Sequence, residues 1–190
     1  ILFFTNYGKV HRKKGYQIPE AGRTAKGTNL VNILPLEPGE KVTAGITVRE
    51  FDEDYLIFVT RNGTVKRLEL SVLNTARKSG IRALTLTEGD ELISVMKTTG
   101  EDDILLATAD GMAICFKETD VRVMGRDAAG VRGILLGSGD YVVGAGIAAE
   151  GKQLLTVTDQ GYGKRTELTE YMRLGENGER SPQGRGGKGL

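Results

Sequence analysis

Short apolar runs recur along the chain, and each is followed by a turn sequence and a second run that begins with polar residues. The clearest case is Tyr55-Leu-Ile-Phe-Val59, which precedes Arg61-Asn-Gly-Thr-Val-Lys-Arg67. An apolar run of this length predicts a buried strand, and an Asn-Gly pair between two strand-like runs predicts a tight hairpin. These residues therefore predict a β-hairpin whose second strand carries two basic residues.

The same pattern occurs four times in the sequence. The turn glycines are Gly8, Gly63, Gly111 and Gly161, at intervals of 55, 48 and 50 residues (8 to 63, 63 to 111, 111 to 161). Similar units at a nearly constant period indicate a repeat array in which neighbouring units share a continuous core.

Two further features recur at fixed places in the repeats. Gly-rich segments that contain Arg or Lys follow the hairpins, and their composition predicts loops. These segments are residues 21–27, 75–82, 124–132 and 183–189. Acidic turns, centred on Gly39, Gly89 and Gly139, stand between later apolar runs. Each complete repeat thus contains about four short strands.

Four strands per unit at a period near 50 residues predict an all-β fold, a propeller-like array of four-stranded blades. The predicted blade repeats are 1–51, 52–101, 102–150 and a partial repeat, 151–190. No helical period persists, although 166–174 has room for one helical turn. The sequence begins inside a strand-like run, which predicts that it is a fragment of a longer chain.

Composition narrows the class of protein. Cys115 is the single cysteine, so a disulfide framework and a CxxC metal site are excluded, and its apolar neighbours predict a buried core residue. No apolar run approaches the roughly 18 residues of a membrane span, and no signal peptide is visible, so we expect a cytoplasmic protein without membrane contact. Trp is absent, which disfavours recognition of single strands by base stacking.

The net charge is only +1, but the charges are distributed by position in the repeat. Cations follow the hairpin turns and occupy the Gly-rich segments, whereas carboxylates occupy the other turns. In a repeat array, equivalent positions form rows, so we predict a basic rim that binds phosphates of duplex DNA. The alternative is that these cations only solvate exposed turns. The predicted DNA-binding residues are Lys9, Arg12, Lys13, Arg23, Lys26, Lys66, Arg67, Arg77, Lys78, Arg82, Arg126, Arg132, Lys164, Arg165, Arg185 and Lys188.

Catalysis has little support in the sequence. His11 is the only histidine and stands in a basic cluster, so we expect an exposed rim residue rather than a general base. Glu101-Asp-Asp103 lacks the ligand spacing of a calcium loop and is expected to be a solvated turn. We therefore predict no catalytic residue, no metal site and no cofactor in this chain.

These motifs resemble those of a known family, the C-terminal domain of DNA gyrase A. The similarity covers the whole length. It is carried by Asn62-Gly-Thr-Val-Lys-Arg67, Gly161-Tyr-Gly-Lys-Arg-Thr166, Met124-Gly-Arg126 and Gly130-Val-Arg-Gly133. The terminal loop, Gln183, Gly184, Arg185, Gly186, Gly187, Lys188 and Gly189, is similar to the family's box, with Gly184 in place of an arginine.

The resemblance implies a β-pinwheel that wraps duplex DNA around its basic rim. The whole enzyme, a type II topoisomerase and heterotetramer with gyrase B that uses ATP and Mg²⁺, would then introduce negative supercoils. The domain itself would be a non-enzymatic module at the nucleoid. The resemblance also leaves open the equivalent C-terminal domain of topoisomerase IV.

Two other functions remain open on the sequence alone. One is a propeller-type scaffold for protein interactions, although such surfaces are usually rich in aromatic residues, which are few here. The other is a binder of single-stranded nucleic acid through the terminal Gly-rich loop, whose composition is also typical of a flexible tail.

Overall fold

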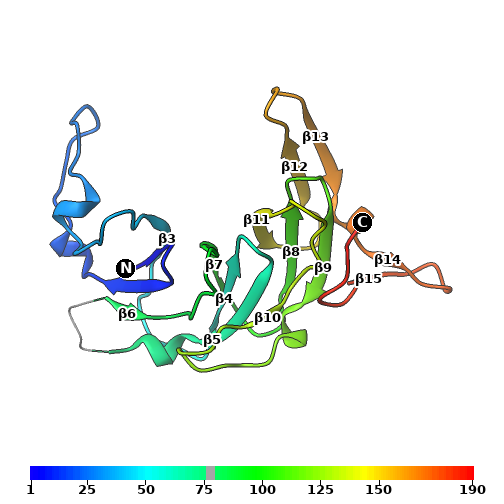
Figure 1. The fold of residues 1–190 in the computed structure, drawn as a ribbon, viewed down its shortest axis with the longest axis horizontal. Coiled ribbons are helices and arrows are strands. Elements are labelled where there is room, and N and C mark those ends of the chain that lie inside the picture. Colours follow the sequence, from blue (N-terminus) through cyan, green and yellow to red (C-terminus); the bar gives the residue numbers. More distant parts are fainter. Residues whose placement is uncertain (76–79) are drawn as a thin grey trace.

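The computed structural model describes residues 1–75 and 80–190, and the four predicted hairpins stand one after another along the molecule (Figure 1). Each is an antiparallel pair. They are hairpin 1, β1 (Leu2–Thr5) and β2 (Lys9–Arg12); hairpin 2, β4 (Tyr55–Thr60) and β5 (Thr64–Glu69); hairpin 3, β8 (Asp103–Thr108) and β9 (Ala113–Lys117); and hairpin 4, β12 (Gln153–Val157) and β13 (Gly163–Glu167). The prediction of an all-β repeat fold is confirmed.

A threonine three residues before the turn glycine fixes the turn in hairpins 2 to 4. The Thr60 hydroxyl accepts a hydrogen bond from the Thr64 amide at 3.1 Å, and Thr108 and Thr158 do the same in their own turns. The turn glycine itself needs a positive φ, which is 82° at Gly63. This local chemistry explains why the same short sequence forms a hairpin each time.

A third strand from the same repeat lies along the first strand of hairpins 1 to 3. These inner strands are β3 (Val42–Ile46), β7 (Leu92–Thr98) and β11 (Val142–Ile147), which pair with β1, β4 and β8. Each follows one of the predicted acidic turns.

The outermost strand of each of the first two sheets comes from the next repeat. β6 (Ile81–Arg82) pairs with β2, and β10 (Val131–Arg132) pairs with β5. Sheet orders are therefore β3-β1-β2-β6 and β10-β5-β4-β7. On hairpin 3, Leu190 and Ala113 exchange backbone hydrogen bonds of 2.8 Å. The sheets consequently cross the predicted repeat boundaries.

The hydrophobic cores lie between adjacent hairpins. Leu56 and Phe58 on one face of β4 pack with Phe4 of hairpin 1, and the Phe4 and Phe58 rings meet edge to face with centroids 5.5 Å apart. Ile57 and Val59 on the other face pack in the core shared with hairpin 3. A strand buried on both faces explains the unbroken apolar run in the sequence.

Short elements connect these sheets. Five 3₁₀ helices occur in the described residues, η1 (Gly15–Gln17), η2 (Leu30–Asn32), η3 (Leu70–Leu73), η4 (Glu118–Asp120) and η5 (Leu168–Tyr171). A further pair, β14 (Arg173–Leu174) and β15 (Arg180–Ser181), projects from the end of the array (Figure 1). Within the part of the chain that the structure describes, no helix is long and apolar enough to span a membrane.

Candidate nucleic-acid interface

Two arginines occupy equivalent places on the outer strands of successive sheets. Arg82 on β6 is opposite Lys9, and Arg132 on β10 is opposite Thr64. The residue after each arginine donates its backbone amide to the carbonyl of the preceding hairpin's turn glycine. Ala83 bonds Gly8, and Gly133 bonds Gly63. Both arginine side chains are exposed. The repeat therefore places an exposed guanidinium at the same position on two neighbouring sheet edges.

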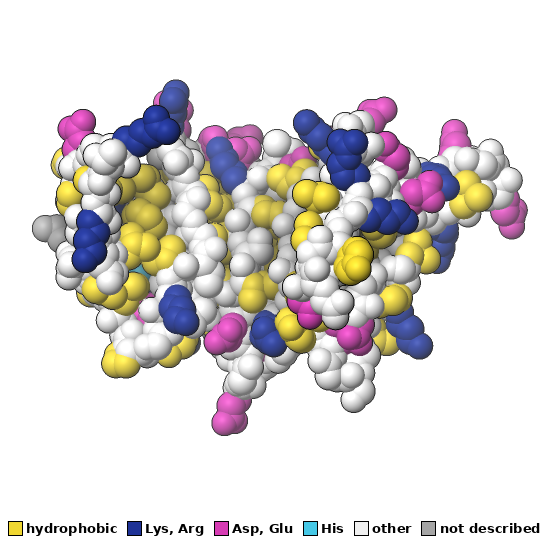
Figure 2. All heavy atoms as spheres, turned by 90° about the horizontal axis from the view of Figure 1, so that it is seen from above, with side chains coloured by type: hydrophobic (Ala, Val, Ile, Leu, Met, Phe, Trp, Pro, Cys, Tyr) yellow, Lys and Arg dark blue, Asp and Glu magenta, His cyan; other side chains and the backbone are white. Residues whose placement is uncertain are grey.

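The other predicted DNA-binding residues differ in exposure. Arg23, Lys26, Lys164, Arg165 and Lys188 are exposed, whereas Lys9, Arg12, Lys13, Arg126 and Arg185 are half-buried. Arg77 and Lys78 lie outside the described residues. On the face seen in Figure 2, Lys and Arg side chains are scattered among polar and acidic ones rather than gathered in one patch. The candidate interface therefore rests on the equivalent exposed arginines of the outer strands, Arg82 and Arg132.

Lys66 does not belong to an exposed rim, which corrects the sequence-based expectation. Its side chain is fully buried, and its Nζ donates hydrogen bonds of 2.7 Å to the carbonyl oxygens of Ala83 and Arg126. Burial lowers the pKa of Lys66 to about 8. This lysine joins segments of the second and third repeats to hairpin 2, and its amine is not accessible to a ligand.

Arg67 is also buried, so its prediction as a rim cation is wrong for the same reason. Its Nε lies 3.3 Å from the carboxylate of Glu118, which is itself fully buried in the next repeat. The guanidinium stacks over Tyr55 at 4.0 Å and donates to the Gly100 carbonyl. Glu118 further accepts bonds from Thr98, Gly100 and Asp102. The pair joins two repeats.

His11 occupies in hairpin 1 the position of Lys66, three residues after the turn glycine. It is 3% exposed, so the expectation of an exposed histidine is wrong. Its Nε2 lies 3.7 Å from the Glu40 carboxylate, and neither ring nitrogen has a hydrogen-bond partner among the described residues. The sequence did contain a signal for these burials, since apolar Ile114 fills the same position in hairpin 3.

The terminal box-like loop packs on hairpin 3 rather than extending as a free tail. The Gln183 amide bonds the carbonyl of Cys115, and the Arg185 guanidinium donates to the carbonyls of Asp120 and Arg132. Arg185 is therefore engaged within the protein, while Lys188 stays exposed. Cys115 beneath the loop is fully buried, as predicted, and burial raises its pKa to about 12.

The carboxylates of the acidic turns have structural partners. Asp90 accepts hydrogen bonds from the Asn62 and Glu91 amides, and Asp140 accepts them from Asp110 and Tyr141. Burial acts to raise the pKa of Asp140, but hydrogen bonds from Thr108 and the backbone outweigh it, and the pKa is lowered. These acids hold one turn against the next.

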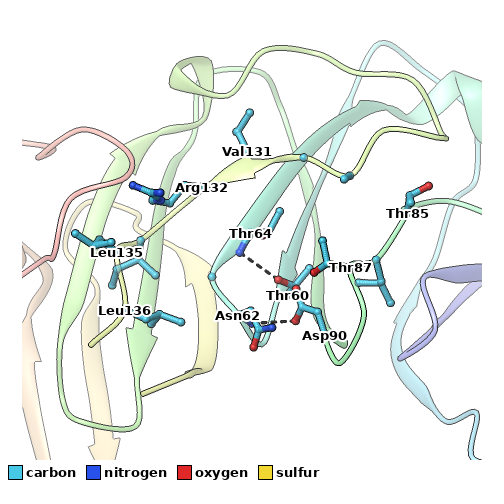
Figure 3. Close-up of a pocket in the computed structure, with 15 residues that line it drawn as sticks. Thr60, Asn62, Thr64, Thr85, Thr87, Asp90, Val131, Arg132, Leu135 and Leu136 are labelled. Carbon is cyan, nitrogen blue, oxygen red and sulfur yellow. Dashed lines mark hydrogen bonds between the residues drawn. The ribbon is translucent and has the colours of Figure 1, made fainter. Parts of the chain in front are cut away.

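A cleft of about 350 Å³ lies beside Arg132, between the turn of hairpin 2 and β10 (Figure 3). Asn62 and Thr87 line it with exposed polar side chains. Such neutral donors beside an arginine are typical of phosphate contacts. Within residues 1–75 and 80–190, no three potential metal-ligating side chains gather at one place.

Comparison with known proteins identifies similar chains. The family model "DNA gyrase C-terminal domain, beta-propeller" matches residues 1–49, 54–99, 102–149 and 152–177. The DNA gyrase A protein of Lawsonia intracellularis is 48% identical over 194 residues, covering 100% of this chain and 23% of the relative. The DNA gyrase A protein of Escherichia coli K12 is 48% identical over 172 residues, covering 90% of this chain and 20% of the relative. The chain thus spans about a fifth of these relatives.

Solved structures agree on the fold. A crystal structure of the C-terminal domain of DNA topoisomerase IV superposes with a TM-score of 0.88 at 29% identity, covering 100% of this chain and 57% of the other. A DNA gyrase A C-terminal domain gives a TM-score of 0.72 at 21% identity, covering 100% and 76%.

Proposed function

The chain belongs to the DNA gyrase C-terminal domain family, and from that premise we propose that its outer strands bind duplex DNA and bend it from one sheet to the next. The bound duplex lies across β6 and β10, where phosphates meet Arg82 and Arg132. Contacts of this kind depend on DNA shape and charge rather than on base sequence.

The observation that carries this proposal is the equivalent, exposed placement of Arg82 and Arg132 on adjacent sheets. A row of cations on a series of sheet edges contacts a duplex at intervals, and the duplex must bend to follow the row. The donors of the cleft beside Arg132 supply neutral contacts to the same backbone.

In the larger protein, this module presents a bent DNA segment for strand passage. Gyrase B, ATP and Mg²⁺ belong to that assembly, which introduces negative supercoils in the bacterial cytoplasm. The chain itself carries DNA and no catalytic step. Its high identity to gyrase A proteins favours this role over decatenation by topoisomerase IV.

The test is binding to duplexes of about 20 and about 100 base pairs across a salt series, measured by fluorescence anisotropy. We expect tighter binding to the long duplex and a steep decrease of affinity with salt. Because each phosphate contact contributes about 0.9 to the slope of log K against log salt, Arg82→Ala combined with Arg132→Ala should reduce that slope by about 2.

Arg49→Ala is the matched control, since Arg49 is an exposed arginine outside the outer strands. Its salt slope should equal that of the wild type. An unchanged slope in the double variant, with circular dichroism showing an intact fold, would refute the outer strands as the DNA path.

A further inference from the structure

Two segments of the chain carry the arginines of the proposed DNA path. The second arm is residues 80–86, which contain Arg82, and the third arm is residues 122–136, which contain Arg132. Each arm supplies a short strand, β6 or β10, to the sheet of the preceding hairpin. The position of one arm relative to the other therefore decides how the two guanidinium groups are spaced along a bound duplex.

A buried lysine side chain connects the two arms. The Nζ of Lys66, on β5, donates a hydrogen bond of 2.7 Å to the Ala83 carbonyl oxygen in the second arm and another of 2.7 Å to the Arg126 carbonyl oxygen in the third arm. Ala83 directly follows Arg82 in the chain. One ammonium group thus holds the backbone beside one of the two exposed arginines against the arm that carries the other.

The two arms also bond each other directly. The Thr85 hydroxyl donates to the Asp127 carbonyl oxygen at 2.8 Å, and the Thr85 amide donates to the Ala128 carbonyl oxygen at 3.3 Å. Thr85 and Arg132 line opposite sides of the cleft described above (Figure 3). The contact between the arms therefore borders the candidate interface.

The charge of Lys66 is not needed to fill the core. A buried charge lowers stability unless it has a partner of opposite sign. Lys66 is 0% exposed, and among the described residues no carboxylate forms an ion pair with it, since Asp127 acts only from a longer distance. In hairpin 3 the equivalent position holds Ile114, also 0% exposed. An apolar residue therefore packs well at this position, and the ammonium group of hairpin 2 has another role.

We propose that Lys66 is a positioning residue of the DNA site, which holds the second and third arms at a fixed spacing so that Arg82 and Arg132 impose a defined bend on the duplex. This inference rests on the function proposed above. A duplex resists bending, and its elastic energy acts to move the two contact points apart. The two hydrogen bonds of Lys66 oppose that movement, because breaking either one would leave a buried carbonyl oxygen without its partner.

The test separates bending of the duplex from contact with its phosphates. Bending is measured as the rate of ring closure by DNA ligase on a duplex of about 150 base pairs, one persistence length, at saturating protein. The pH is about 7, where Lys66 holds its proton. The wild-type chain should accelerate ring closure, and Lys66→Met should lose about half of that acceleration or more, because its arms yield to the stiffness of the duplex.

Contact with phosphates is measured as the salt slope on the duplex of about 20 base pairs. The slope of Lys66→Met should differ from that of the wild type by less than about 0.5, because Arg82 and Arg132 both remain. A residue with no part in the DNA site would leave ring closure and salt slope alike unchanged. Loss of bending with the slope preserved is therefore the signature of a positioning residue.

Ile114→Met is the matched control, because it places the same side chain at the equivalent position of hairpin 3. Its ring-closure rate should equal that of the wild type. Thr85→Val removes the hydroxyl that bonds Asp127 and should reduce the acceleration in the same direction as Lys66→Met, by a smaller factor. Circular dichroism checks the fold of each variant, and Thr85→Val decides the question if Lys66→Met does not fold.

Three results would overturn the proposal. One is wild-type ring closure by folded Lys66→Met, or by Thr85→Val in its place. Another is an equal loss with Ile114→Met, which would assign the effect to core packing. The third is a decrease of the Lys66→Met salt slope by about 2, as expected for the Arg82 and Arg132 double variant, which would make Lys66 a phosphate contact itself.

The failure of this inference is distinct from that of the proposed function. If the Arg82 and Arg132 double variant keeps the wild-type salt slope, both are refuted. If that variant loses about 2 from its slope while Lys66→Met closes rings at the wild-type rate, only the role of Lys66 is refuted.

Discussion

Hairpins 2 and 4 share a threonine, a turn glycine and a following Lys-Arg pair at the same spacing, and the structure places these basic pairs in opposite environments. In hairpin 2, Lys66 and Arg67 are 0% and 8% exposed, and each contacts the next repeat, Lys66 at the Arg126 carbonyl and Arg67 at Glu118. In hairpin 4, Lys164 and Arg165 face solvent. The difference shows that a cation that recurs at the same position in each repeat can serve to hold two repeats together. Recurrence alone therefore does not identify a binding surface.

The comparison also separates two kinds of cation in this fold. Lys66 and Arg67, on the second strand of hairpin 2, are covered by the docked segments around them, whereas Arg82 and Arg132, on the outer strands, stay exposed. The proposed DNA path uses this second kind, Arg82 and Arg132.

The largest expected effect is a loss of stability on breaking the contact between Arg67 and Glu118, which hairpin 2 has and hairpin 4 lacks. Glu118→Ala leaves the buried Arg67 without its carboxylate and the amides of Gly100 and Asp102 without an acceptor. We expect a loss of about 3–5 kcal/mol in the free energy of unfolding, measured by urea denaturation. Glu101→Ala, at an exposed acid in the neighbouring turn, should stay within about 0.5 kcal/mol. Equal losses in the two variants would contradict the joint.

A second effect follows from the lowered pKa of Lys66, about 8 when folded against an ordinary value of 10.5. Below pH 8 both the folded and the unfolded states hold the proton, so Lys66 adds no pH dependence. Between pH 8 and 10.5 only the unfolded state holds it, so the free energy of unfolding should rise by up to about 1.4 kcal/mol per pH unit.

The measurement is urea denaturation of the wild type and of Lys66→Met from about pH 7 to 10.5. The difference between their unfolding free energies should grow in favour of the wild type above pH 8. Lys164→Met, at an exposed lysine, should show no such trend. A flat difference for Lys66→Met would mean that its amine is not desolvated in solution.

The smallest effect compares one hydrogen bond in both hairpins. Thr60 and Thr158 each accept from an amide four residues on, but Thr60 is 1% exposed and Thr158 faces solvent. Thr60→Val leaves the half-buried Thr64 amide without its acceptor and should cost about 1–3 kcal/mol, whereas Thr158→Val should stay within about 0.5 kcal/mol. Thermal unfolding measures both, and a reversed order would show that burial does not decide the value of this bond.

The sequence predicted the elements of the fold well because their signals are local. Positive φ at Gly63 and Gly89, for example, follows from turn chemistry that lies within a few residues. The apolar run before Gly63 likewise predicted a buried strand. Repetition then supplied the period and the all-β class.

What the sequence did not predict depends on contacts between distant repeats. Nothing near Lys66 indicates that carbonyls of residues 83 and 126 meet its amine, and nothing near Arg67 indicates the carboxylate of Glu118. The alternation within a hairpin defines its own pairing but not what covers its edge. The sequence predicted that Arg82 and Arg132 are exposed, which is confirmed, but not that they lie on the outer strands of two sheets; their binding to DNA stays a prediction.

Because each of the first two sheets is completed by a strand of the repeat that follows, the order of synthesis matters for how this chain folds. The edge of β2 at Lys9 pairs with Arg82, and the edge of β5 at Thr64 pairs with Arg132. Both partners are synthesised later, so each of these hairpins leaves the ribosome with one edge unpaired. An open edge can pair with another chain during this interval. Each of these hairpins is therefore prone to aggregation until the strand that covers its edge has been synthesised, β6 for hairpin 1 and β10 for hairpin 2.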